Sequence, residues 1–150
     1  MKCILTLLCC LSLASVFAET IGNVEYSLPN LAKKWEVDNQ LQNDIETTLI
    51  YRPAGSKEFF RVNVNRHVLA RKDASALKAN MKAIYPNLDV TLWMLSQEKD
   101  GAVYEWSAKD TRQEKIHGWG RTFLSHDGTV VLGYQTENMR DIETARYIWL

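Results

Sequence analysis

Cysteine is absent from the chain after Cys10. All three cysteines, Cys3, Cys9 and Cys10, lie in an N-terminal segment with the pattern of a secretory signal: one positive residue, Lys2, then an apolar run that ends at Ala18. The mature chain is therefore expected to have no thiol and no disulfide. This excludes thiol catalysis and zinc sites built on cysteine. Burial alone must hold such an exported domain together.

Neither sign of charge is in excess, and no second long apolar run follows the signal. The 18 basic and 18 acidic residues give a formal net charge of zero, so no field is available to attract nucleic acid. A membrane-spanning helix needs about 20 consecutive apolar residues, a length that no later segment approaches. We expect residues 1–18 to be a signal peptide and residues 19–150 a single domain, exported to the periplasm or secreted by a bacterium.

Hydrophobic periodicity predicts mostly strands, with two helices. Alternation is clearest over 59–68, and a turn-forming segment, Arg52 to Ser56, precedes it. Apolar residues recur at helical spacing from Asp73, a candidate N-cap, to Tyr85. The other predicted strands cover 24–28, 35–37, 45–51, 88–97, 103–108, 116–125 and 129–136. A second helix covers 138–150, with Asn138 as a candidate N-cap.

The last four strands are joined by short turns and should form an antiparallel meander. The segment 88–97 has apolar residues on both faces, so it is expected at the centre of the sheet. Both helices have an apolar stripe that needs a surface to cover. The predicted fold class is therefore α+β, with an antiparallel sheet flanked by helices as an α/β/α sandwich.

The order of elements, together with two short segments, carries a resemblance. Tyr26-Ser27-Leu28-Pro29 leads into Trp35-Glu36-Val37, and this start resembles exported bacterial members of the superfamily that includes the PsbP subunit of photosystem II and the Ran-binding Mog protein. The resemblance implies a PsbP/Mog-like α/β/α fold and a binding or accessory role, as in assembly factors, adaptors or chaperones. It implies no catalytic residue.

No motif for a nucleophile elbow, a phosphate loop or a zinc protease occurs, and we expect no catalytic site, metal or cofactor. His126 lies in a predicted turn, and His117 is nine residues away at the other end of one strand, too far for a shared metal. His67 ends the polar face of the strand that carries Arg61 and Asn63. It could act in acid–base chemistry with a carboxylate, since its unperturbed pKa lies near neutrality.

Gly118-Trp119-Gly120 interrupts a predicted strand with two glycines. Such glycines indicate a bulge or the close approach of another group. Trp119 should point the same way as Arg121, which gives an aromatic and cationic face suited to a partner. Alternatively, a helix covers Trp119 and the glycines make room for it.

These observations favour a non-enzymatic, exported binding module. Its partner is expected to be another protein or a small ligand, recognised through a strand face made of Arg61, Asn63, His67, Trp119 and Arg121. The alternative is a small exported hydrolase that uses His67 or His117 with a carboxylate.

Overall fold

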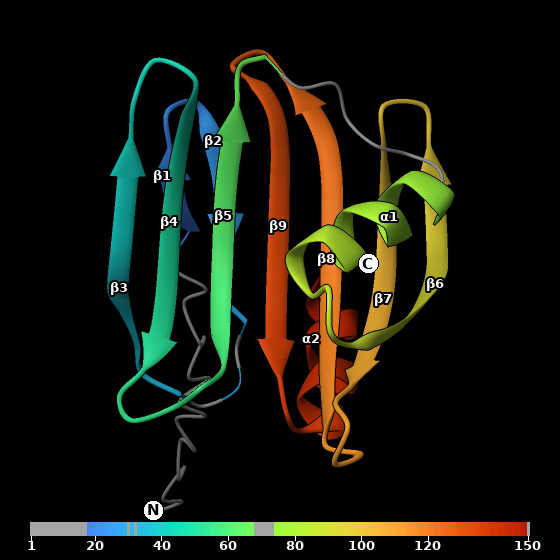
Figure 1. Ribbon diagram of the computed structural model, residues 1–150. Coiled ribbons are helices and arrows are strands. Elements are labelled where there is room, and N and C mark those ends of the chain that lie inside the picture. Colours follow the sequence, from blue (N-terminus) through green and yellow to red (C-terminus); the bar gives the residue numbers. More distant parts are fainter. Residues whose placement is uncertain (1–17, 30, 32, 68–73, 150) are drawn as a thin grey trace, which may run out of the picture.

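One antiparallel sheet of seven strands organises the molecule (Figure 1). The computed structural model describes residues 18–29, 31, 33–67 and 74–149. The elements are β1 (Ala18–Ile21), β2 (Val24–Ser27), β3 (Trp35–Gln42), β4 (Glu46–Pro53), β5 (Phe59–Asn65), α1 (Ala74–Ile84), β6 (Asp89–Glu98), β7 (Gly101–Lys109), β8 (Lys115–Ser125), β9 (Gly128–Thr136) and α2 (Met139–Trp149). The spatial order in the sheet is β3-β4-β5-β9-β8-β7-β6, and β1 pairs only with β2.

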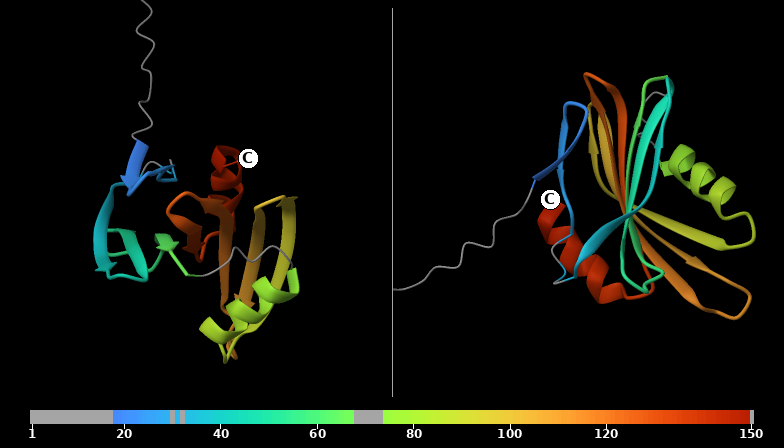
Figure 2. Two further views of the ribbon diagram at one scale, coloured as in Figure 1. Left: turned by 90° about the horizontal axis from the view of Figure 1, so that it is seen from above. Right: turned by 90° about the vertical axis from the view of Figure 1, so that its left-hand side faces the viewer.

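The two faces of the sheet are covered differently (Figure 2). Helix α1 lies on one face, which we call the α1 face and which carries Arg61 and Tyr104. Helix α2 and the β1–β2 hairpin lie on the opposite face, the α2 face, which carries Phe60 and Trp119. Antiparallel register assigns these faces, because directly paired residues point the same way.

The larger core lies on the α2 face. Strands β5, β8 and β9 contribute fully buried side chains, and the hairpin and α2 close over them. The residues of this core with the largest side chains include Tyr26, Tyr51, Phe60, Trp119, Tyr134 and Ile142. The hydroxyls of Tyr26 and Tyr51 share a hydrogen bond, which satisfies two polar groups that burial would otherwise leave unpaired.

A network of polar groups fastens α2 to the sheet. Lys33 Nζ donates to Glu58 Oε2 at 2.8 Å and to Asp141 Oδ2 at 2.6 Å. The Tyr134 hydroxyl also donates to Glu58, at 2.8 Å, and Glu58 is only 8% exposed. The network therefore runs from Asp141 of α2 to Lys33 in the loop after β2, and from Lys33 through the buried Glu58 carboxylate to Tyr134 in the sheet.

The predicted α/β/α sandwich is wrong, because the structure is mostly β. The described residues form nine strands and two helices of 11 residues each. Helix α1 packs mainly on β6 and β7, and α2 shares its face with a β-hairpin. Neither face therefore has the continuous helical layer that a sandwich requires. Both helices were predicted correctly, but helices of this length cover less of the sheet than was expected.

The predicted central position of the strand at 88–97 is also wrong, because β6 lies at the margin of the sheet. Strand β9 pairs with β5, so the free end of the meander becomes an edge. Helix α1 covers Leu92 and Met94, whereas Trp93 and Leu95 remain 47% and 37% exposed. An apolar pattern on both sides of a strand thus did not require cover on both sides.

Other local predictions are confirmed. The meander β6–β7–β8–β9 is antiparallel throughout, and α1 ends before Pro86, as its periodicity predicts. The Asn138 side chain caps α2 by accepting from the Arg140 amide at 3.1 Å. The signal peptide, apart from Ala18, and the candidate cap Asp73 lie outside the described residues.

The β1–β2 hairpin was not predicted, although the sequence of its turn is typical of a hairpin. Ile21 and Val24 flank Gly22-Asn23, a two-residue turn of the kind that joins antiparallel strands, and Gly22 has a φ of +61°.

Among the described helices, neither is long and apolar enough to cross a membrane.

Replacing Glu58 tests the polar network. Burial by itself raises the pKa of Glu58, but the hydrogen bonds from Lys33 and Tyr134 outweigh it and hold the pKa below its ordinary value of 4.5. The charged carboxylate therefore stabilises the fold above about pH 4.5, and this contribution is lost as the pH falls towards the lowered folded-state pKa. We expect Glu58→Gln to reduce the free energy of unfolding by about 2 kcal/mol at pH 7.

Urea unfolding at pH 7 and at pH 3 measures this effect. The matched control is Glu137→Gln, since Glu137 is exposed and its nearest cation, Lys57, is 3.6 Å away. The control should change stability by less than about 0.5 kcal/mol at pH 7. Equal effects of the two substitutions at pH 7 would contradict the structural role of Glu58.

Candidate functional site

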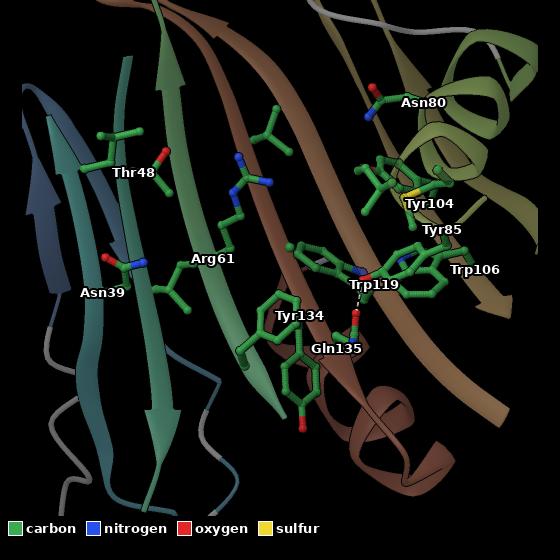
Figure 3. Close-up of a pocket in the computed structure, with 17 residues that line it drawn as sticks. Asn39, Thr48, Arg61, Asn80, Tyr85, Tyr104, Trp106, Trp119, Tyr134 and Gln135 are labelled. Carbon is green, nitrogen blue, oxygen red and sulfur yellow. Dashed lines mark hydrogen bonds between the residues drawn. The ribbon is translucent and has the colours of Figure 1, made fainter. Parts of the chain in front are cut away.

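A pocket of about 350 Å³ opens on the α1 face of the sheet (Figure 3). It begins where α1 stops covering the sheet and extends towards the edge strand β3. One wall comes from α1 and the segment after it, and the other from β3, β4 and β5. The lining is mostly apolar, with polar groups from Asn39, Thr48, Asn80 and Gln135. Its size lies near the lower end of the range of about 300–1,000 Å³ for ligand sites.

One row of paired residues forms the centre of this pocket. Arg61 on β5 pairs with Gly133 on β9, Gly133 pairs with Gly120 on β8, and Gly120 pairs with Tyr104 on β7. Neighbouring strands are about 4.8 Å apart. The Tyr104 ring covers Gly120, whereas no atom lies within 4 Å of a Cβ position at Gly133, so Gly133 leaves a gap between the Arg61 and Tyr104 side chains. Figure 3 shows Arg61 between Thr48 on one side and Tyr104 and Trp106 on the other.

The Arg61 guanidinium has no counter-ion within the described part of the chain. Its Nε atom is buried and unpaired, and no hydrogen bond or ion pair joins the Arg61 side chain to any described residue. Among the described residues that line the pocket, Arg61 is also the only one with a charge. A half-buried cation without an anion is costly, and an unsatisfied buried group in a native fold calls for a physical explanation.

Aromatic side chains form the wall opposite Arg61, and glycines make room for them. A Cβ on Gly118 would lie 2.0 Å from the Trp106 ring, and one on Gly120 would lie 2.4 Å from the Tyr104 ring. Both rings therefore lie flat over the backbone of β8. The Tyr85 ring packs against Trp106 with centroids 5.4 Å apart, and its hydroxyl donates to Gln135 Oε1.

Tyr104 supplies a hydrogen-bond donor next to the gap. Burial raises its pKa to about 12, against a smaller lowering effect of the positive Arg61. The phenol therefore stays protonated at neutral pH. The opposing effect of Arg61 also shows that the two side chains are close enough to interact, as it does for Tyr85, whose pKa burial raises and Arg61 lowers. A donor and a cation thus flank the space over Gly133.

The structure distributes the five predicted recognition residues over different places. Arg61 lines the pocket, and Asn63 lies beside it on the α1 face, where its amide donates to Glu46 and Thr48 at 2.8 and 2.7 Å. His67 is exposed beyond the end of β5. Trp119 and Arg121 flank Gly120 in sequence and so point to the α2 face.

Trp119 is 0% exposed and lies in the core with Ile142 and Ala145 of α2. A helix therefore covers Trp119, as the alternative interpretation expected. The two glycines beside it, however, make room for the Trp106 and Tyr104 rings and not for Trp119. Arg121 lies 5.3 Å from the Phe123 ring centroid and 3.8 Å from Glu98. Of these three residues, only Arg61 has its side chain on the α1 face, although Trp119 is also among the residues that line the pocket.

The hydrolase alternative requires a histidine paired with a carboxylate. No hydrogen bond or ion pair joins His67 or His117 to a carboxylate among residues 18–29, 31, 33–67 and 74–149. Burial first and Lys115 second hold the pKa of His117 below its ordinary value. His126 lies 3.7 Å from Asp127 in an exposed turn. The same part of the chain holds no cluster of three or more His, Cys, Asp or Glu that could bind a metal.

Sequence reasoning missed the aromatic wall and the gap at Gly133. No role had been predicted for Tyr85, Tyr104 or Trp106. Comparison with known proteins found no matching family model, no matching curated protein and no matching solved structure. The residues of the pocket are therefore the basis for a functional conclusion.

Two glycine substitutions test the aromatic wall. Gly118→Ala should destabilise the fold by about 1–3 kcal/mol, because the new methyl group overlaps the Trp106 ring. The matched control is Gly133→Ala on the neighbouring strand, where no atom lies within 4 Å of the new Cβ. The control should stabilise the fold by about 0.5–1 kcal/mol, since alanine restricts the unfolded chain more than glycine does. Thermal or urea unfolding that ranks the two variants in the opposite order would contradict the described packing.

Proposed function

We propose that this protein is an exported binding module and that its ligand is a small anionic molecule held in the pocket on the α1 face. The observation that carries the proposal is the unpaired Arg61 guanidinium in a mostly apolar pocket. An anion would satisfy this cation through charge-assisted hydrogen bonds, the strongest kind that a protein makes. The apolar and aromatic walls would bind the rest of the molecule by excluding water.

The arrangement supports binding rather than turnover. A catalytic site needs a nucleophile or an acid–base pair at hydrogen-bond distance from the reacting group. The polar groups around Arg61 are amides, phenols and a threonine hydroxyl, and the pocket lining includes no histidine or carboxylate among the described residues. Without a histidine or carboxylate beside them to serve as a general base, these groups are better suited to orient a ligand than to activate it.

Replacing Arg61 tests this proposal. Calorimetric titration with benzoate, hexanoate and phenyl phosphate, each at neutral pH, measures the binding of anions with different bodies, and benzamide serves as the neutral probe. We expect at least one anion to bind with saturation and benzamide to bind much more weakly. Arg61→Gln should weaken anion binding by about ten- to a hundredfold, as expected for the loss of a hydrogen-bonded charge.

Arg121→Gln is the matched control. Arg121 lies in the same sheet and also has a buried Nε without a hydrogen-bond partner, but it points to the α2 face and interacts with Glu98 and Phe123. Its replacement should leave anion binding unchanged. Failure of all three anions to bind, or equal losses in the two variants, would overturn the proposal.

A further inference from the structure

Gly133 has no structural explanation within the fold. It lies inside β9, a strand with a neighbour on each side, where glycine costs stability relative to other residues. Its φ is not positive, so the backbone there does not require glycine. Gly118 and Gly120 each face an aromatic ring at less than 3 Å from a Cβ position, whereas a Cβ on Gly133 would meet no atom within 4 Å.

The open space over Gly133 lies between the two polar groups identified above. Arg61 is its paired neighbour on β5, and Gly120, covered by the Tyr104 ring, is its paired neighbour on β8. The floor of this space is the bare backbone of β9 at Gly133. One edge is a guanidinium and the other is an aromatic ring with a hydroxyl donor. A planar aromatic ring packs more favourably beside the Tyr104 ring than a puckered or branched group does.

The charge of the site limits the charge of the ligand. Arg61 is the single cation among the described lining residues, so one negative charge gives neutrality. The planar guanidinium fork matches the two oxygens of a carboxylate.

From these three features we propose that the ligand is a planar aromatic monocarboxylate whose ring lies on the backbone at Gly133 and whose carboxylate pairs with Arg61. This inference rests on the proposed function and adds the chemical class of the ligand. Gly133 is then the residue that determines specificity, because any side chain there occupies the position of the ring. The Tyr104 and Trp106 rings contact the edge of the ligand, a favourable arrangement for aromatic groups.

Comparison of benzoate with cyclohexanecarboxylate tests the planarity of the ligand. The two have the same charge and the same number of ring atoms, but only benzoate is flat. In calorimetric titrations at neutral pH, benzoate should bind at least about tenfold more tightly. Phenyl phosphate, which carries up to two charges, should also bind more weakly than benzoate. Equal affinities for benzoate and cyclohexanecarboxylate would overturn the inference.

Substitution of Gly133 tests the position of the ring. Gly133→Leu should reduce the affinity for benzoate by at least about tenfold, while its urea midpoint stays at or above that of the unaltered protein. The smaller Gly133→Ala should give an intermediate loss of affinity. If Gly133→Leu fails to fold, NMR of the unaltered protein replaces it: benzoate should shift the amide resonances of Gly133 and Gly120, and cyclohexanecarboxylate should shift them much less.

The outcomes separate this inference from the proposed function. If Gly133→Leu binds benzoate as the unaltered protein does, the ring lies elsewhere and the inference fails, although an anion site at Arg61 stands. If benzoate and cyclohexanecarboxylate bind equally and both depend on Arg61, the inference fails, although the anion site of the proposed function stands. If Arg61→Gln has no effect on any anion, the proposed function fails and the inference fails with it.

Discussion

The pairing of β5 with β9 is the contact on which both the fold and the pocket depend. Strands β3–β4–β5 and strands β6–β7–β8–β9 each form a meander through local turns, and only the ladder from Phe59↔Gln135 to Asn65↔Thr129 joins them into one sheet. A shift of this register by one residue would turn Arg61 to the α2 face. The ladder therefore fixes the larger core and the position of the only charged group in the described pocket lining.

The treatment of buried charge differs between the two faces. On the α2 face, the Glu58 carboxylate receives hydrogen bonds from Lys33 and Tyr134. On the α1 face, the Arg61 guanidinium has no partner. A fold that satisfies a buried carboxylate so completely in one place makes an unsatisfied cation in another place significant. The polar network stabilises the α2 face, and the α1 face holds the pocket for which we propose a binding role.

Much of the local structure could be predicted from the sequence, because it depends on neighbours within about ten residues. The helical spacing before Pro86, the Asn138 cap and the turns of the meander are examples. The aromatic wall could also have been predicted. The turn between β7 and β8 lies midway between the two aromatic residues and the two glycines, so antiparallel pairing places Tyr104 opposite Gly120 and Trp106 opposite Gly118. The predictions of a sandwich and of a central β6 were wrong, because sequence periodicity shows which faces are apolar but does not show what covers them.

The sequence by itself determined the elements, their periods and the balance of charge, since these follow from local sterics and from the alternation of side chains along a strand. Tertiary structure decided which residues meet. Arg61 and Gly133 are far apart in the chain, and nothing in either segment specifies their pairing. Their contact depends on the burial of an entire sheet face, which is a property of all its strands together. The pocket, and with it the candidate function, is created by that collective packing.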